Sequence, residues 1–467
     1  MSKLSSYRRK VMKKSRICTA LLMTSLLMSA ALTGCGSATG SQSAQSQTAA
    51  KSEESKADTA NDAKAETSAA SAENQASGAS VASGTGAEFV PALDTGAELT
   101  INFVGGWGNF EALDQVALDF QKYYPDVEIA YSKLDDVKAD ILNRFATGEG
   151  IDIFMNDYWK FKEEDFDTLK EYAEDLNESG IDLSSIDQNL LKVYDIDGYQ
   201  AEFPLYNAVF GYMINEDIFE SVGVSVPTTY EELKDCCEKL MEAGYEHPFF
   251  MHDSYNKVCF MPYYWHLIDE GKDPEAAFTE MINMAEEFNS LPYIYDVTGE
   301  IEDNYNALIL RFFEGDVPMA AISTTNFSGT KKREAKSEKF TAEPFKYDFA
   351  QIALTDEPMG LYENPLATLY VGVYKNSPNL DYANEFLRFM YSQDEMKIFE
   401  RIKNQPVADA NVGYEDFPLL EKLEKVTGNC STREKIRIQY AGHEAIKKFK
   451  AGTDNAEAWE AFREFLK

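Results

Sequence analysis

The sequence predicts an α/β protein with two lobes, in which helices cover parallel sheets. Strands and helices alternate in β-α-β order from residue 99 onward. Their apolar residues follow the periods of strands and of helices. About 370 residues follow a polar N-terminal stretch, which is enough chain for two lobes with separate cores.

The N-terminus has the features of an export signal. Basic residues from Arg8 to Arg16 precede an apolar run from Ile17 to Leu32. This run contains hydroxyl residues and is shorter than the roughly 20 apolar residues of a transmembrane helix, so it is typical of a cleaved signal peptide. It leads into Leu-Thr-Gly-Cys35, which resembles the bacterial lipobox, where the cysteine receives diacylglycerol and becomes the mature N-terminus. We expect a lipoprotein signal peptide over residues 1–34 and lipidation of Cys35. An ordinary secretory signal with an incidental cysteine is the alternative.

The mature chain is strongly acidic. Removing residues 1–34 takes away seven of the 44 basic residues and none of the 79 acidic ones, so the formal charge falls from −35 to −42. Such a charge repels nucleic acid and anionic lipid headgroups and keeps a tethered protein soluble. We therefore expect no nucleic-acid partner, and a monomer held at the outer face of the cell membrane by its N-terminal lipid.

A polar stretch follows the lipid site. Residues 35–97 consist mainly of Ser, Ala, Thr, Gln, Gly, Lys and Glu, and their first aromatic residue is Phe89. This composition buries too little apolar surface to offset the entropy of ordering the chain. We expect a disordered tether that ends at residue 97.

The folded part opens with β-α-β units. Its first predicted elements are a strand at 99–104, a glycine-rich turn at 105–108, a helix at 109–124 that stops at Pro125, a strand at 127–131, a helix through Ile141 and Phe145, and a strand at 151–155. This order predicts a parallel sheet covered by helices.

Later segments continue the pattern. They are a strand and short helix at 212–219, a helix beginning at Thr229, an amphipathic helix at 378–390, and a C-terminal helix with the stripe Trp459, Phe462 and Leu466. Thr229 and Glu232 have the spacing of a capping box, in which a hydroxyl and a carboxylate each accept a hydrogen bond from an amide at the helix start.

Four blocks in this order resemble the extracellular solute-binding protein family whose best-known members bind maltodextrins and other sugars. They are the opening strand and turn with Tyr124–Ile129 and Thr147–Phe154, the segment Gly211–Leu233, the stretch Phe312–Ala320, and Val371–Ser377 with Asn404–Val407. Within the second block, Met-Ile-Asn stands where the family usually has an aromatic residue before Asn, and Tyr230 stands where Trp is common. Each block alone is a weak match; their order after a lipobox makes the resemblance specific.

The resemblance implies a type II periplasmic-binding-protein-like fold, with two discontinuous α/β lobes and a ligand cleft between them. We expect the N-terminal lobe at 98–204 plus 355–404 and the C-terminal lobe at 205–354 plus 405–467. The implied function is a substrate-binding protein that captures a carbohydrate by lobe closure and docks on the permease of an ABC importer. No cofactor is implied.

Ligand residues are expected in loops at the carboxyl ends of strands and beside the crossovers. Sugars stack on aromatic rings and exchange hydrogen bonds with amides and carboxylates, so we sought mixtures of these residue types. The candidates are Trp107, Asn109, Glu111, Asn156, Asp157, Tyr158, Trp159, Tyr206, Asn207, Tyr212, Trp265, Thr325, Asn326, Tyr362 and Asn364.

Several candidates have structural alternatives. Trp107 and Trp159 can equally cap a core edge, and Trp265 can pack inside its own lobe. Asp157 and Glu111 can serve as helix N-caps, which for Glu111 is the interpretation that we favour. Asp152 is expected to hold its strand in place.

Enzymatic and metal functions have little support in the sequence. It lacks His-Glu-x-x-His, Gly-x-Ser-x-Gly and a glycine-rich phosphate loop, although a glycosidase needs only two carboxylates. His247 and His252 are too few for a zinc site without further ligands. The mature cysteines Cys236, Cys237, Cys259 and Cys430 match no metal pattern, and we expect mostly buried thiols, with a bridge between the last two left open.

Two other binding functions stay open. One is a receptor that presents its solute to a membrane sensor kinase. The other is a binder of polyamines or metal complexes with a carboxylate-rich cleft.

Overall fold

The computed structural model describes residues 89–107, 110–157, 159–251, 256–297, 305–324, 330–364, 368–403, 405–412, 417, 422, 435–436, 438 and 455–466. All of them lie in the compact unit Ala82–Lys467. The predicted signal peptide, Cys35, most of the predicted tether, and the side chains of Cys259 and Cys430 lie outside the described residues.

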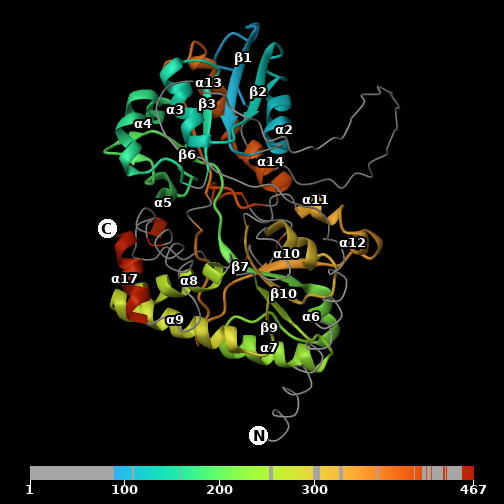
Figure 1. The fold of residues 1–467 in the computed structure, drawn as a ribbon. Coiled ribbons are helices and arrows are strands. Elements are labelled where there is room, and N and C mark those ends of the chain that lie inside the picture. The colour runs from blue at the N-terminus through green and yellow to red at the C-terminus, as the bar shows by residue number, and fades with distance from the viewer. Residues whose placement is uncertain are drawn as a thin grey trace, which may run out of the picture. The chain divides into compact units, whose positions relative to one another are not determined.

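Five described strands form the first sheet, in the order β2-β1-β3-β12-β6 (Figure 1). They are β1 (Leu99–Gly105), β2 (Val127–Lys133), β3 (Ile153–Asn156), β6 (Phe203–Pro204) and β12 (Tyr370–Val373). β1 pairs in parallel with β2 and β3, as the β-α-β units predict, whereas β12 runs antiparallel to β3 and β6. The sheet is therefore mixed rather than parallel, because a strand from much later in the chain pairs with β3.

Helices cover both faces of this sheet, since alternate residues of its strands point to opposite sides. Phe103 of β1 belongs to a core shared with helices α2, α13 and α14. Its neighbour Val104 belongs to a second core shared with α3 and α4. The helices of this region are α2 (Glu111–Phe120), α3 (Val137–Thr147), α4 (Phe166–Tyr172), α5 (Gln188–Leu191), α13 (Leu380–Met390) and α14 (Gln393–Lys403).

Five described strands form the second sheet, in the order β11-β7-β10-β8-β9. They are β7 (Phe210–Asn215), β8 (Phe249–Met251), β9 (Ile294–Asp296), β10 (Met319–Ser323) and β11 (Tyr347–Ala350). A hairpin of β4 (Asp195–Ile196) and β5 (Tyr199–Gln200) stands apart from both sheets. β7 contributes Tyr212 to one core and Met213 to another, so both faces of this sheet are covered as well.

The helices around the second sheet pack mainly on the Tyr212 side. They are α6 (Glu216–Val222), α7 (Tyr230–Glu242), α8 (Asn256–Asp269), α9 (Pro274–Ser290), α10 (Tyr305–Phe312), α11 (Thr330–Glu334), α12 (Glu338–Ala342) and α17 (Asn455–Leu466). Trp459 and Phe462 of α17 pack against Phe278 of α9, which confirms two of the three residues of the predicted C-terminal stripe. The side chain of Leu466 is not among the described ones.

The predicted capping box at α7 is half confirmed. Thr229 caps the helix, because its hydroxyl accepts a hydrogen bond from the Glu232 amide at 3.3 Å. The Glu232 carboxylate accepts from the amide of Thr228 at 2.8 Å rather than from that of Thr229. The return hydrogen bond is therefore shifted by one residue. Within α7, Cys236 and Cys237 are free buried thiols, as predicted, and burial raises the pKa of Cys236 to about 12.

Residues 89–97 are packed against the first sheet's helices, although the sequence predicts a disordered tether up to residue 97. The Phe89 ring contacts Phe389 with ring centroids 4.9 Å apart, and the Arg388 guanidinium lies 4.2 Å from the Phe89 centroid. The Ala92 amide donates to Glu385 Oε1 at 2.9 Å. We call these contacts of Phe89 and Ala92 with Glu385, Arg388 and Phe389 the N-terminal clamp. Phe89 and Leu93 both pack against the core of the first sheet, so the short apolar run at 89–93 supplies the surface that orders this segment.

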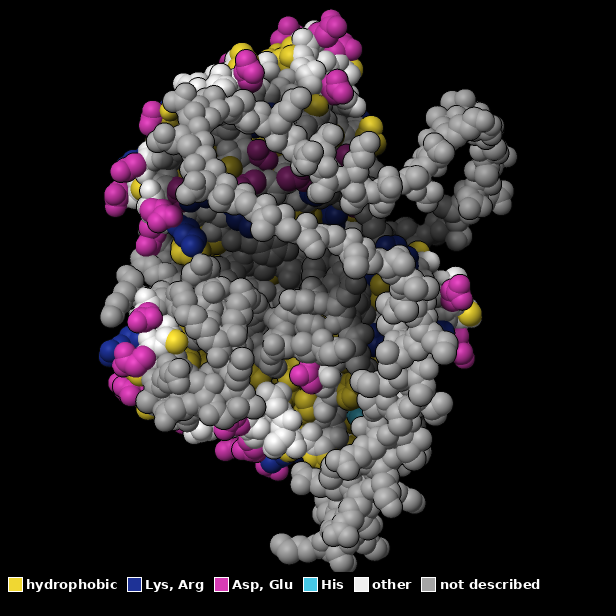
Figure 2. All heavy atoms as spheres, viewed as in Figure 1, with side chains coloured by type: hydrophobic (Ala, Val, Ile, Leu, Met, Phe, Trp, Pro, Cys, Tyr) yellow, Lys and Arg dark blue, Asp and Glu magenta, His cyan; other side chains and the backbone are white. Residues whose placement is uncertain are grey.

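Among the charged side chains that are coloured in this view, Asp and Glu are more prominent than Lys and Arg (Figure 2). This distribution agrees with the formal charge of −35. Among the described helices, none is long and apolar enough to cross a membrane.

Candidate functional site

The carboxyl ends of β1 and β3 meet at a tight glycine turn. A Cβ on Gly106 would lie 2.5 Å from Asp157 Oδ2 and 2.7 Å from Val137 Cγ2, so only glycine fits there. The turn after β1 therefore lies directly against the Asp157 carboxyl. This close approach brings two of the predicted ligand loops together.

Trp107, the residue after this turn, is half-buried and held from several sides. Its ring stacks on Tyr206 with centroids 5.7 Å apart and planes 14° from parallel. Tyr131 donates a hydrogen bond to the Trp107 carbonyl at 3.0 Å. The Lys403 ammonium lies 5.2 Å from the ring centroid. Trp107 and Tyr206, which are 99 residues apart in the sequence, thus form one aromatic platform.

Glu111 lies beside the platform, where it is paired with a lysine that the sequence analysis did not identify. Its Oε2 is 3.0 Å from Lys403 Nζ, and the Lys403 side chain is buried. Glu111 is the first residue of α2 and Phe110 occupies the N-cap position, so the favoured N-cap interpretation of Glu111 is wrong. The ion pair instead ties the start of α2 to the end of α14.

Two buried amide side chains next to the platform have unsatisfied hydrogen-bonding groups. Asn207 and Gln405 are fully buried, and within the described part neither the oxygen nor the nitrogen of either amide has a partner. The Asn207 backbone amide donates to Pro406 O at 2.8 Å, which places the two segments side by side. Unpaired buried amides are costly, so such groups commonly mark positions where a ligand or water binds. Gln405 was missed as a candidate, although it lies in one of the four family-like blocks.

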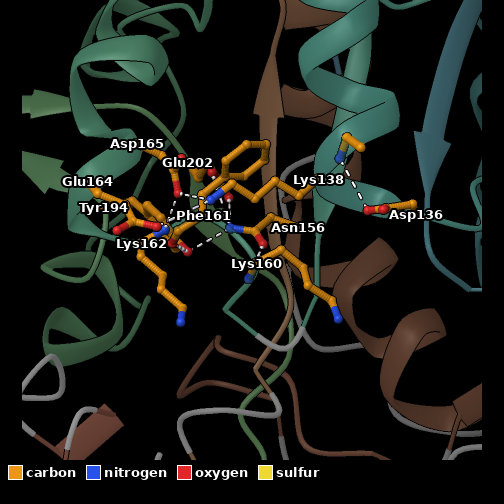
Figure 3. A network of polar contacts seen from close by, with 11 residues as sticks. Asp136, Lys138, Asn156, Lys160, Phe161, Lys162, Glu164, Asp165, Tyr194 and Glu202 are labelled. Carbon is orange, nitrogen blue, oxygen red and sulfur yellow. Dashed lines mark hydrogen bonds and ion pairs between the residues drawn. The ribbon is translucent and has the colours of Figure 1, made fainter. Parts of the chain in front are cut away.

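Asn156, at the end of β3, is fully engaged by protein groups (Figure 3). Its Oδ1 accepts from the Lys160 amide at 3.0 Å, and its Nδ2 donates to Tyr194 Oη at 2.6 Å and to Glu202 Oε2 at 3.1 Å. Asn156 therefore supports the loop that follows it and has little capacity left for a ligand. Glu202 and Tyr194 were not identified from the sequence, because they lie 46 and 38 residues further along the chain.

The loop after Asn156 contains two more candidates. Asp157 is buried, its Oδ1 has no partner among the described residues, and burial raises the pKa of this carboxyl while the Lys160 charge opposes the shift. Trp159 is buried with a left-handed backbone φ of 51°, and Lys162 Nζ lies 5.5 Å from its ring. Nearby, Asp152 accepts a hydrogen bond from the Asn102 amide at 2.6 Å, which confirms its structural role.

The candidates of the second sheet form a separate group. Trp265 is buried in α8 and stacks on Tyr362 at 6.3 Å, and no described residue accepts a hydrogen bond from its indole nitrogen. Asn364 donates to Ser323 Oγ at 2.8 Å. Tyr212 lies inside the core, in edge contact with Phe249, and its hydroxyl accepts from the Ala353 amide at 3.3 Å. The structure therefore brings Trp265, Tyr362 and Asn364 together but places Tyr212 in the packing beneath them.

Four predicted ligand residues, Asn109, Tyr158, Thr325 and Asn326, lie outside the described residues. So does His252, whereas His247 stacks on Tyr295 with centroids 4.1 Å apart. Within the described part, no three His, Cys, Asp or Glu side chains are grouped so as to hold a metal ion. What the described residues offer a ligand is aromatic surface, buried amides and carboxyl groups.

Comparison with known proteins identifies the family. The family model described as "Bacterial extracellular solute-binding protein" matches residues 106–397. No curated protein sequence matches the chain.

Several solved structures are similar to this one. The GacH receptor of Streptomyces glaucescens, solved unliganded and with acarbose, is 16% identical, with a TM-score of 0.62 over 79% of this chain and 99% of its own. RafE of Streptococcus pneumoniae, in its apo form, is 17% identical, with a TM-score of 0.59 over 79% and 97% of the two chains. The maltotriose-binding protein of Thermus thermophilus is 13% identical, with a TM-score of 0.57 over 78% and 99%. These proteins have the two-lobed fold of type II periplasmic binding proteins, which confirms the predicted fold class.

Proposed function

The chain belongs to the bacterial extracellular solute-binding protein family, and from this premise we propose that it captures a carbohydrate between its lobes and delivers it to an ABC importer. Membership makes it an extracytoplasmic binding protein and not an enzyme. The sugar, the importer and the lipid anchor are the parts that we propose.

The observation that supports a sugar ligand is the pairing of an aromatic platform with buried amides. Trp107 is half-buried and is backed by the fully buried Tyr206, so it offers a flat apolar surface of the kind on which sugar C–H groups stack. Asn207 and Gln405 supply amide groups that both donate and accept, as sugar hydroxyls do. Lys403 and Glu111 form an ion pair beside them, so these two charges neutralise one another. An uncharged polyol fits this chemistry better than a polyamine does.

The proposed ligand site extends the platform to both sheets. Asp157 and Trp159 contribute from the loop after β3, and Trp265, Tyr362 and Asn364 contribute from the group beside the second sheet. We also propose as ligand residues four that lie outside the described part: Asn109, Tyr158, Thr325 and Asn326. We propose the lobes at 98–204 plus 355–404 and at 205–354 plus 405–467, with closure about the segments that join them.

The proposed cellular location rests on the sequence alone. A lipobox cysteine at Cys35 anchors the protein to the outer face of the membrane, and residues up to 88 link the lipid to the clamped segment that starts at Phe89. The partner is the permease of an importer. Globomycin, which blocks lipoprotein signal cleavage, should leave the full-length precursor in cells, whereas Cys35→Ser should release the protein from the membrane.

Isothermal titration calorimetry tests the sugar. We expect saturable heat with a member of a panel of maltotriose, raffinose and acarbose, and none with spermidine or a ferric chelate. Trp107→Ala should weaken the affinity at least about tenfold, because stacking residues are the usual hot spots of such sites. Tyr245→Ala is the matched control, since Tyr245 is also a half-buried aromatic residue but lies on the second lobe near α7. Heat with spermidine and silence with all sugars would overturn the sugar proposal.

A further inference from the structure

The loop after β3 is held by a buried polar network in which Asn156 links the loop to Tyr194 and to the carboxyl group of Glu202 (Figure 3). Asn156 joins the network to the loop at Lys160, whose amide donates to Asn156 Oδ1 at 3.0 Å. Tyr194 joins it at Phe161, because the tyrosine hydroxyl donates to the Phe161 carbonyl at 2.7 Å. The Asn156 amide in turn donates to the tyrosine oxygen and to the Glu202 carboxyl. Two backbone positions of the loop are therefore fixed through a single asparagine side chain.

Glu202 is the buried end of this network. Its exposed fraction is 0%, and the Asn156 amide is the side chain that hydrogen-bonds to its carboxyl. Among the described residues, no Lys or Arg forms an ion pair with it. A carboxylate in such a place loses its hydration and gains no cation, so the uncharged acid is the stable form.

We propose that Glu202 is a positioning residue, which in its protonated form holds the 157–161 loop through Asn156 and Tyr194 in the conformation that receives the ligand. This inference rests on the proposed function, because Asp157 and Trp159 of that loop are proposed ligand residues. Loss of the proton releases the loop, which makes ligand capture dependent on pH.

The physical reason is the cost of a buried negative charge. Burial raises the pKa of Glu202 to about 8, and the hydrogen bond from Asn156 opposes this shift. Above that pH the carboxylate has to be hydrated, and water can enter only by separating the groups that enclose it. Asn156 hydrogen-bonds to the Glu202 carboxyl directly, so its hydrogen bond to the loop is the contact most directly exposed to the change.

Among the described residues, the titratable groups around Glu202 do not supply a compensating positive charge. The hydroxyls of Tyr194, Tyr370 and Tyr391 are close enough for Glu202 to raise their pKa values further, after the larger effect of burial. On the side of α3, Lys138 is bound to Asp165 at 2.6 Å. The other charged groups around the network are Lys160, Lys162 and Glu164 on or near the loop, and Asp187 and Glu363 beside Tyr370.

Hydrogen exchange read by mass spectrometry tests the network without any ligand. Exchange of the peptide that covers residues 157–162, corrected for the intrinsic effect of pH, should accelerate between pH 7 and pH 9 in the unmodified protein. Glu202→Gln keeps the shape of the side chain but cannot ionise, so its exchange should stay at the pH 7 level. An exchange rate that is independent of pH in the unmodified protein, or that rises equally in Glu202→Gln, would overturn the inference.

Glu395→Gln is the matched control. Glu395 is also buried, and burial together with the charge of Asp119 raises its pKa to about 8, but it lies on α14 and faces α2. For both glutamates the folded chain keeps a proton that the unfolded chain releases above about pH 4.5, so the free energy of unfolding falls as the pH rises from about 4.5 to about 8. Each Gln variant should therefore lose less stability as the pH rises. Only Glu202→Gln should abolish the pH-dependent increase in hydrogen exchange of the 157–162 peptide.

Affinity for maltotriose provides the second measurement. With a pKa of about 8, about one molecule in ten keeps the Glu202 proton at pH 9, so the affinity should fall about tenfold from pH 7 in the unmodified protein. The affinity of Glu202→Gln should change less than twofold over that range. If maltotriose binds at neither pH, the choice of sugar in the proposed function fails, while the exchange experiment still decides the role of Glu202. Equal losses of affinity in the unmodified protein and in Glu202→Gln would contradict the proposed role of Glu202.

Discussion

Single residues determine how the two loops of the first lobe meet. Gly106 has no side chain, and the Asp157 carboxyl and Val137 occupy the space that a Cβ would need. The β1 turn can therefore lie this close to the β3 loop only because residue 106 is glycine, which has no side chain. Because Trp107 follows directly, a displacement at Gly106 also moves the aromatic platform.

Gly106→Ala should lower the free energy of unfolding by about 1–3 kcal/mol, as expected when an extra methyl group is forced into a packed position. It should also weaken sugar binding, because it displaces both Trp107 and Asp157. Chemical denaturation and calorimetry measure the two effects. Gly96→Ala is the control, since a Cβ there meets only Asp94 Oδ1 at 3.6 Å, an ordinary contact. Equal stability of the two variants would show that the turn can relax.

The candidate site could be predicted from the sequence in part. Position after a strand selected Trp107 as a candidate, because the carboxyl ends of neighbouring strands meet at one edge of a sheet, and position beside a crossover selected Tyr206. The same rule selected Asn156, whose amide is occupied by Tyr194 and Glu202. Those partners come from other segments, and nothing local in the sequence reveals the pairing. Lys403 and Gln405 were missed for the same reason.

At the scale of elements, local patterns predicted most of the first lobe. The alternating strand at 99–104 and the helix before Pro125 appear as β1 and α2 with small shifts of their ends. The antiparallel insertion of β12 between β3 and β6 was not predicted. Strand order depends on which distant segment fills an open edge, and periodicity carries no information about that choice.

Helix α7 provides a test at this scale. Thr229→Ala removes the hydroxyl that accepts a hydrogen bond from the Glu232 amide. We therefore expect the free energy of unfolding to fall by about 1 kcal/mol, the usual contribution of an N-cap. Thr228→Ala is the comparison, because it removes the exposed hydrogen bond from Thr228 Oγ1 to Glu232 Oε2 at 2.9 Å but keeps the hydrogen bond from the Thr228 amide and the Thr229 cap, so it should cost less. Urea denaturation followed by circular dichroism measures both. If Thr228→Ala proved the more costly change, Thr229 would not be the effective cap.

At the scale of the whole molecule, the folded body begins earlier than composition indicates. The N-terminal clamp joins Phe89 and Ala92 to residues nearly 300 positions later, on and beside α13. The end of the polar stretch is ordered there because Arg388 and Glu385 satisfy its backbone while Phe89 and Leu93 supply the apolar contacts. Sequence composition averages over such a segment and therefore places its boundary too late.

A chain that begins at residue 98 should be less stable than one that begins at residue 89. We expect the free energy of unfolding to fall by about 3 kcal/mol, since a packed aromatic side chain and a cation–π contact are lost together. Thermal and urea denaturation of the two chains measure the difference. Phe89→Ala in the longer chain should reproduce most of the loss. Equal stability of the two chains would mean that the clamp contributes nothing to folding.

The clamp also decides where a mechanical load enters the protein. Any pull on the chain that precedes Phe89 reaches α13 and the first sheet before it reaches the second sheet. A molecule immobilised by its N-terminus is therefore attached to the surface through its first lobe. Single-molecule recordings with that attachment would report the swing of the other lobe against a stationary frame.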